Sequence, residues 1–142
     1  MLIEQILKTK GGEVTTIDAT KTLAEAARLL DEAKIGAVVA VNGDGLAGVL
    51  SERDILRQVA RHGADALQMT VENSMTRGVI TANPQETIDQ CLGRMTDRRV
   101  RHLPVIRDGS LAGIISIGDL VKWKIEEHKA EADAMAEYIK GG

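Results

Sequence analysis

The feature that most constrains the fold of this chain is an internal repeat. A shift of 65 positions aligns residues 14–54 with residues 79–119 without a gap. A unit of this size buries little apolar surface alone, so the two copies are expected to pack together. Eight aligned positions are identical, and five of them lie in the block that closes each copy: Val14/Val79, Thr16/Thr81, Thr22/Thr87, Leu46/Leu111, Ala47/Ala112, Gly48/Gly113, Ser51/Ser116 and Asp54/Asp119.

Each copy predicts the element order β-α-β-β-α. The apolar runs 37–41 and 103–106 are long enough for buried strands and too short for helices. Gly- and Asn-containing turns follow them, and return strands are expected at 46–50 and 111–115. Helices are expected to begin near Thr22 and Thr87, because apolar residues with helical spacing follow each threonine. The predicted class is therefore α/β, of the α+β kind.

These elements predict four segments along the chain. The first repeat is expected at 10–62, a linker at 63–74 and the second repeat at 75–125. Residues 126–142 are expected to form a helical tail that is largely solvated and makes some apolar contacts.

Composition limits the classes of function. The formal net charge of −3 and the scarcity of aromatic residues (one Trp, one Tyr, no Phe) argue against nucleic-acid binding. Cys91 is the only cysteine, so an intramolecular disulfide is excluded, and no Cys/His cluster has zinc-site spacing. The N-terminus lacks signal-peptide features, and no segment approaches a membrane span of about 20 apolar residues. We expect a cytoplasmic protein without membrane contact.

A shared motif marks the candidate chemistry. The blocks Gly48–Asp54 and Gly113–Asp119 both follow the pattern G-x-x-S-x-x-D at a strand-to-helix turn. A helix N-terminus attracts anions, so each serine is suited to a phosphate and each aspartate to ribose hydroxyls. The alternative is an ordinary capping box, which needs no ligand. The two copies in register favour the nucleotide handle, although either copy alone favours the cap.

The combined motifs resemble the CBS domain, named for cystathionine β-synthase, as a tandem pair (Bateman module) in a stand-alone bacterial-type protein. The second repeat carries V-x-x-x-x-P-x-x-T at 79–87, H-L-P-V at 102–105, D-G-x-L-x-G at 108–113 and S-x-x-D at 116–119. The first repeat departs from it, with Ala19 in place of Pro84 and Val38-Val39 in place of Leu103-Pro104. The resemblance covers about residues 10–125.

The resemblance implies two repeats packed sheet to sheet about a pseudo-twofold axis, with a ligand cleft at each. In that arrangement adenine lies against the first and central strands, while Ser/Asp pairs hold phosphate and ribose. The implied binding residues of one cleft are Thr16, Ile17, Ala37, Val38, Ser51 and Asp54, and those of the other are Thr81, Ala82, His102, Leu103, Pro104, Ser116 and Asp119.

Basic residues distinguish the two predicted clefts. Arg53 lies inside the first motif, where the second has Gly118. Arg101 and His102 border the second cleft, and we interpret them as ligand contacts. For Arg98 and Arg99, phosphate binding and a solvated helix C-terminus are both open.

The predicted function is an energy or redox sensor that binds AMP, ADP, ATP or NAD(H) and regulates an unknown partner by ligand-dependent repacking. A homodimer is expected from the resemblance. No catalytic cofactor or metal is expected. Enzymatic activity is not expected, since the chain offers no nucleophile–base pair and no Walker-type loop. The alternatives are a structural module with vestigial clefts and, last, a nucleotide-acting enzyme.

Overall fold

The computed structural model describes residues 1–11 and 14–141, and the chain divides into two compact units. We call Glu13–Ile80 the first-repeat unit, and Met1–Gly12 with Thr81–Gly142 the second-repeat unit. Two predicted segments, the first repeat and the tail, include residues 12–13 and 142, which lie outside the described residues. The mixed α/β class is confirmed, whereas the sheet-to-sheet packing of the two repeats stays a prediction.

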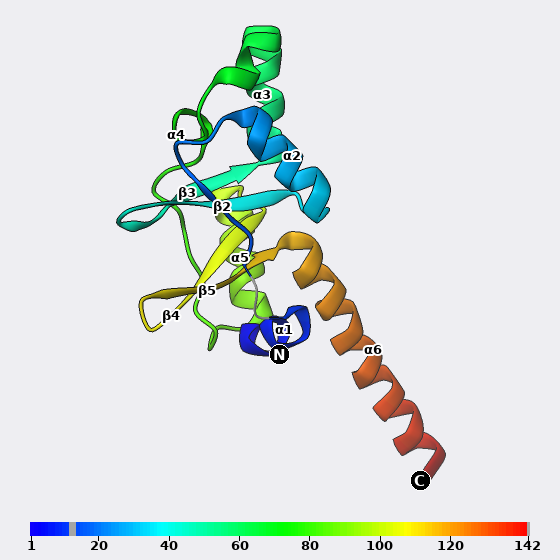
Figure 1. Ribbon diagram of the computed structural model, residues 1–142. Helices are drawn as coiled ribbons and strands as arrows, with labels where there is room; N and C mark the ends of the chain where they lie inside the picture. Colours follow the sequence, from blue (N-terminus) through cyan, green and yellow to red (C-terminus); the bar gives the residue numbers. More distant parts are fainter. Residues whose placement is uncertain (12–13, 142) are drawn as a thin grey trace. The chain divides into compact units, whose positions relative to one another are not determined.

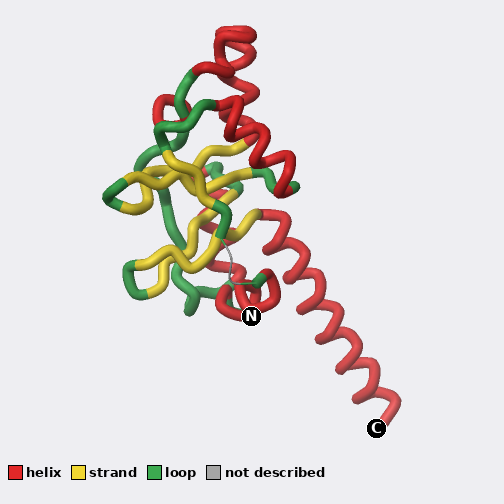
Figure 2. Tube along the Cα trace, in the orientation of Figure 1, coloured by secondary structure: helices red, strands yellow, loops and turns green. Residues whose placement is uncertain are grey.

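The first-repeat unit follows the predicted order. Its three-stranded sheet has the order β1-β2-β3, with β1 parallel to β2 and β2 antiparallel to β3 (Figures 1 and 2). Thr22 caps the first helix by accepting from the Glu25 amide, as the sequence predicts. The elements are β1 (Thr16–Asp18), α2 (Leu23–Ala33), β2 (Ala37–Asn42), β3 (Gly45–Ser51), α3 (Glu52–His62), the 3₁₀ helix η1 (Gly63–Gln68) and α4 (Val71–Ser74).

The second-repeat unit has a shorter sheet. Strands β4 and β5 pair antiparallel, and the predicted first strand is reduced to a parallel bridge between Ala82 and Val105. In the first repeat the ladder continues because the Ala19 amide donates to the Val41 carbonyl at 2.9 Å. Pro84 occupies the equivalent position and has no N–H to donate. The elements are α1 (Ile3–Lys10), α5 (Ile88–Arg98), β4 (His102–Arg107), β5 (Ser110–Ser116) and α6 (Ile117–Gly141).

The short helix before each repeat belongs to the unit of the other repeat. The Ile3 amide of α1 donates to the Glu86 carbonyl at 2.9 Å, and the Val71 amide of α4 donates to the Lys21 carbonyl at 2.8 Å. Ile3 and Val71 are therefore equivalent, at a shift of 68 rather than 65. The compact units accordingly differ from the predicted segments, since residues 1–9 join the second repeat and the predicted linker joins the first.

The motif glycines allow these helices to approach the return strands. A Cβ at Gly48 would lie 2.5 Å from the Thr76 carbonyl oxygen, and a Cβ at Gly113 would lie 2.6 Å from Leu7 Cδ2. Real Cβ atoms are not found so close to other atoms, so packing requires glycine at position 48, whereas a side chain at position 113 would require Leu7 to move.

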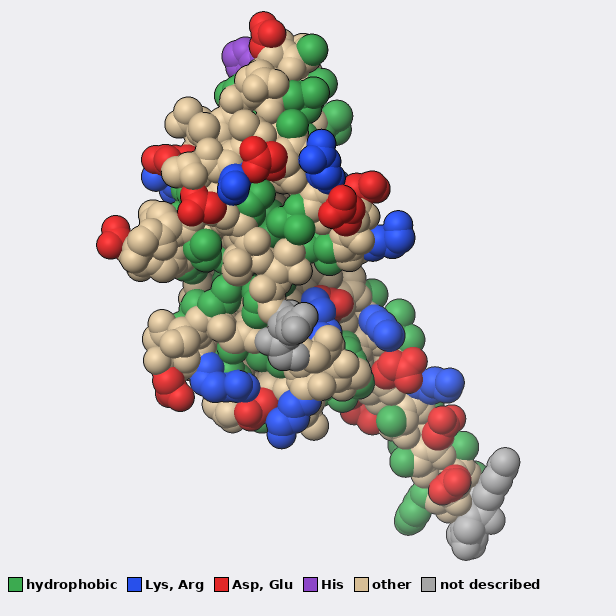
Figure 3. Space-filling model, viewed as in Figure 1, with side chains coloured by type: hydrophobic (Ala, Val, Ile, Leu, Met, Phe, Trp, Pro, Cys, Tyr) green, Lys and Arg blue, Asp and Glu red, His purple; other side chains and the backbone are tan. Residues whose placement is uncertain are grey.

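Helix α6 contains both the predicted closing helix and the predicted tail. Lys, Arg, Asp and Glu side chains are interspersed along it (Figure 3). Met135, Tyr138 and Ile139 are strongly exposed, so the apolar contacts predicted for the tail are not formed. Among the described residues, no helix combines the length and apolar character that a membrane crossing requires.

Candidate functional site

The first Ser/Asp pair forms a reciprocal capping box at the start of α3. The Asp54 amide donates to Ser51 Oγ at 3.3 Å, and the Ser51 amide donates to Asp54 Oδ2 at 2.9 Å. The Ser51 hydroxyl also donates to that oxygen at 3.1 Å, and Arg57 Nη1 donates to Asp54 Oδ1 at 3.2 Å. The capping interpretation is thus realised in the structure, and it places a buried carboxylate and a hydroxyl at one helix N-terminus.

The second pair repeats this geometry at the start of α6. The Asp119 amide donates to Ser116 Oγ at 3.1 Å, and the Ser116 amide donates to Asp119 Oδ2 at 2.9 Å. In addition, Lys10 Nζ of α1 donates to the same carboxylate oxygen at 2.7 Å. This contact joins residues 109 positions apart, and sequence reasoning missed it.

The charge of Asp119 is stabilised despite partial burial. Burial by itself raises the pKa of this carboxyl group, but the hydrogen bonds from Lys10 and the Ser116 amide and the Lys10 charge outweigh it. The pKa of Asp119 therefore lies below its usual value of 3.8. An ionised carboxylate is the form that accepts hydrogen bonds from hydroxyl groups.

Strand register brings part of the first predicted cleft together. Ala37 lies opposite Ser51 in the β2–β3 ladder, and the Glu52 amide donates to the Gly36 carbonyl at 2.9 Å. Ile17 and Val38 belong to the hydrophobic core of this unit, so their side chains are occupied by packing. Only their backbone groups are suited to a ligand, whereas Thr16 is exposed.

The second predicted cleft has the same register. His102 lies opposite Ser116, and the Ile117 amide donates to the Arg101 carbonyl at 2.8 Å. The Arg101 side chain is exposed and His102 is half-buried. Ala82, Leu103 and Pro104 are buried, and the Ala82 amide donates to the Pro104 carbonyl at 2.9 Å.

Thr81 is positioned by a residue that the sequence did not single out. Arg94 Nη1 of α5 donates to the Thr81 carbonyl at 2.9 Å, and the same guanidinium forms an ion pair with Glu86. The hydrogen bond from Arg94, which outweighs burial, holds the pKa of Glu86 below its usual 4.5. Arg94 lies three residues after Cys91 on α5, and none of the sequence motifs indicated it.

The other basic residues are exposed and lie near helix ends. Arg53 is in the first turn of α3. Arg98 ends α5, and Arg99 is its C-cap with a left-handed backbone (φ 55°). This placement accounts for Arg98 and Arg99 as helix-terminal cations.

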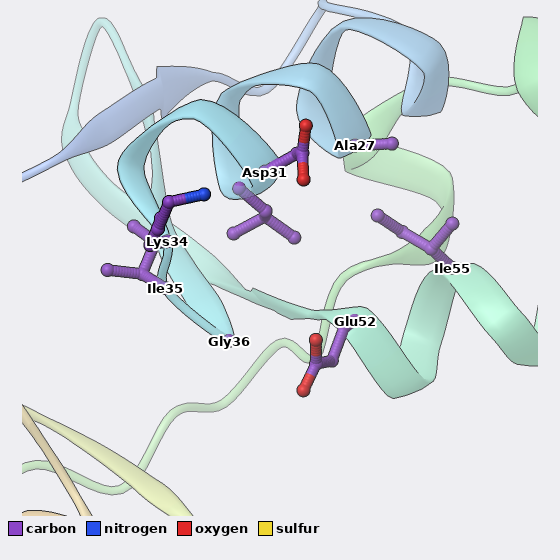
Figure 4. Close-up of a pocket in the computed structure, with 8 residues that line it drawn as sticks. Ala27, Asp31, Lys34, Ile35, Gly36, Glu52 and Ile55 are labelled. Atoms are coloured by element: carbon purple, nitrogen blue, oxygen red, sulfur yellow. The ribbon is translucent and has the colours of Figure 1, made fainter.

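A pocket of about 490 Å³ lies beside the first Ser/Asp pair. Figure 4 shows that its lining comes from the end of α2, the connection at Ile35 and Gly36, and the first turns of α3. Gly36 and Glu52 adjoin the predicted residues Ala37 and Ser51, but no predicted binding residue lines the pocket itself.

No cluster of three or more potential ligands for a metal ion occurs among the residues that the structure describes.

A duplicated α/β unit with a Ser/Asp pair at each strand-to-helix turn defines a tandem-repeat module. A family model for the CBS domain matches residues 3–61 and 70–126. The chain therefore belongs to the CBS-domain family, whose paired members are typically regulatory.

Relatives and solved structures agree with this assignment. The mitochondrial CBS domain-containing protein CBSX3 of Arabidopsis thaliana is 33% identical, over 99% of this chain and 72% of the relative. A CBS-domain-containing protein from Agrobacterium tumefaciens has a TM-score of 0.82 at 43% identity, covering 85% of this chain and 91% of that one.

One structural neighbour contains ligands. The CBS domain pair of protein MJ0100 has a TM-score of 0.79 at 26% identity, covering 89% of this chain and 98% of the neighbour. That pair was solved in complex with 5′-methylthioadenosine and S-adenosyl-L-methionine.

Proposed function

We propose that this chain is a regulatory module that binds an adenosine-containing ligand, AMP, ADP, ATP or NAD(H), at its two Ser/Asp pairs. The observation that carries the proposal is the repeated geometry of these pairs. Each places an aspartate carboxylate, a serine hydroxyl and a helix N-terminus within one turn of chain. The adenosine-based ligands of the MJ0100 pair support the same ligand class.

Each group has a defined role in this proposal. The carboxylates of Asp54 and Asp119 accept hydrogen bonds from ribose hydroxyls. Ser51 and Ser116, at the positively polarised N-termini of α3 and α6, receive phosphate oxygens. Ala37 and His102 lie opposite Ser51 and Ser116 in the strand ladders. Thr16 and Thr81 are the proposed contacts from the first strand position of each repeat, and Arg53 and Arg101 supply exposed positive charge. No catalytic cofactor is required.

Ligand binding would act on the arrangement of the two repeats. A ligand shifts an equilibrium between arrangements only by its differential affinity for them. The sensor output would then reach a partner protein through exposed surfaces such as α6. A cytoplasmic location stays a prediction.

A thermal-shift screen tests the ligand class. AMP, ADP, ATP, NAD⁺ and NADH are each added to the wild-type chain, and at least one is expected to raise Tm. A ligand at about 100 times its Kd stabilises the native state by about 2.7 kcal/mol. No shift with any of the five would refute the proposal.

Matched variants separate binding from a purely structural module. Asp54→Ala and Asp119→Ala remove the proposed ribose acceptors, and Glu32→Ala, on the exposed surface of α2 and outside the pocket lining, is the control. The two site variants should lose the ligand-dependent shift from their own repeat. An unchanged shift in both favours the module with vestigial clefts. Turnover of a bound nucleotide would instead favour an enzyme.

A homodimer is also proposed, supported by apolar side chains on the surface of α3 and α6. Leu56 is 68% exposed, and Ile125 is 60% exposed. Exposed apolar surface of this kind often marks an interface. Light scattering coupled to size exclusion should report a dimer that Leu56→Glu or Ile125→Glu weakens; a monomeric wild type would contradict it.

A further inference from the structure

Lys10 distinguishes the two Ser/Asp pairs. Its ammonium group contacts Asp119, whereas α4, which precedes the other repeat as α1 does, ends at Ser74 before the position that would correspond to Lys10. Asp54 pairs instead with Arg57 of its own helix, α3. The Asp54 carboxylate thus has a cationic partner from its own helix, α3. The Asp119 carboxylate has one from a separate helix, α1.

The position of Lys10 is defined by two acceptors. Nζ donates to Asp119 Oδ2 at 2.7 Å and to the Ile114 carbonyl of β5 at 3.0 Å. The Lys10 side chain remains 39% exposed, so it can exchange partners without unfolding α1. The ammonium group therefore lies against β5 and the first turn of α6.

We propose that Lys10 makes the second-repeat site select phosphorylated adenosine ligands over unphosphorylated ones. The inference rests on the proposed function. A ribose hydroxyl that binds Asp119 competes with the ammonium group for the carboxylate. A phosphate on the same ligand gives the displaced ammonium group a new anionic acceptor, whereas a neutral nucleoside gives it none. The first-repeat site receives no lysine from α4 and therefore lacks that selection.

Calorimetry in an Asp54→Ala background tests the selection at the second site alone. AMP and adenosine are titrated into Asp54→Ala and into Asp54→Ala/Lys10→Gln. The ratio of AMP affinity to adenosine affinity should fall about tenfold when Lys10 is replaced, the scale of one charge-assisted hydrogen bond. Lys8→Gln is the control, because Lys8 is an exposed cation on the same helix. An unchanged ratio in the Lys10 variant overturns the inference.

A measurement without ligand tests the contact itself. The carboxyl pKa of Asp119, followed by NMR, should rise in Lys10→Gln and stay unchanged in Lys8→Gln. No rise would overturn the inference while leaving the proposed function standing. A wild type that binds neither AMP nor adenosine but binds another of the five nucleotides overturns the inference alone, and one that binds none of the five overturns the proposed function as well.

Discussion

At the scale of single residues, the two motif glycines differ in what surrounds them. The atom nearest to a Cβ at Gly48 is a backbone oxygen, which cannot move without shifting the chain. At Gly113 it is the end of the Leu7 side chain, which can rotate. The first motif position should therefore tolerate an added side chain less well in the first repeat than in the second.

Alanine substitution should reveal this difference. Gly48→Ala is expected to lower the free energy of unfolding by about 1–3 kcal/mol, the usual cost of overpacking. Gly113→Ala should cost less, because Leu7 can adjust. Urea denaturation of both variants measures the costs. Equal costs, or a larger cost at Gly113, would show that the Thr76 contact is not decisive.

Cys91 should be inert in the native protein. Its side chain is fully buried on α5, and burial raises the pKa of its thiol to about 11. Alkylating reagents attack the thiolate, so iodoacetamide at pH 8 should modify the native chain only slowly and the urea-unfolded chain rapidly. Mass spectrometry follows the reaction. Rapid native modification would mean that α5 opens readily.

At the scale of elements, α1 should stabilise the repeat that it does not precede. Ile6 is fully buried within the second-repeat unit, and Ile6→Ala is expected to cost about 2–5 kcal/mol. Hydrogen exchange should then rise in β4 and β5 before it rises in β1–β3. Faster exchange confined to β1–β3 would be inconsistent with the packing of α1.

The Glu86–Arg94 ion pair should make the stability of the chain depend on pH in the acidic range. The pKa of Glu86 is lowered in the folded chain, so its stabilisation is present above the usual 4.5 and is lost as pH falls through the folded value. Glu86→Gln should therefore lower Tm at pH 7, and the difference from wild type should shrink as the pH falls below 4.5 and through the lowered pKa of Glu86. A difference independent of pH would argue against the ion pair.

Much of this element pattern could be predicted from the sequence, because it depends on local signals. Short apolar runs, turn residues and the caps Thr22 and Thr87 lie within a few residues of the elements that they define. In the second repeat, the first strand is reduced to a single bridge because Pro84 lacks the N–H that would extend the ladder. The partner of α1 was missed because its repeat relation needs a shift of 68, which a gapless alignment at 65 does not detect.

The candidate site shows the same division between local and distant contacts. Both Ser/Asp pairs lie within a single helical turn, and their capping geometry could be predicted. Lys10 reaches Asp119 across 109 positions, and Arg94 acts on Thr81 through tertiary packing. The apolar run 37–41 predicts a buried strand, and Val38 packs into the core as that prediction requires.

At the scale of the whole molecule, the chain is a tandem module whose two Ser/Asp pairs are similar in geometry but differ in their cationic partners. Each unit has its own sheet, its own Ser/Asp pair and a short helix from before the other repeat. The segment that precedes each repeat is therefore part of the fold of the other unit. A regulatory module needs a connection of this kind between ligand and output.

Native mass spectrometry tests the central claim most directly, with the purified chain incubated in turn with AMP, ADP, ATP and NAD(H). The account predicts adenosine-ligand adducts, up to two per chain, with one lost in Asp54→Ala and one in Asp119→Ala. A wild-type spectrum without adducts for AMP, ADP, ATP or NAD(H), or adducts unchanged in the double variant, would contradict it.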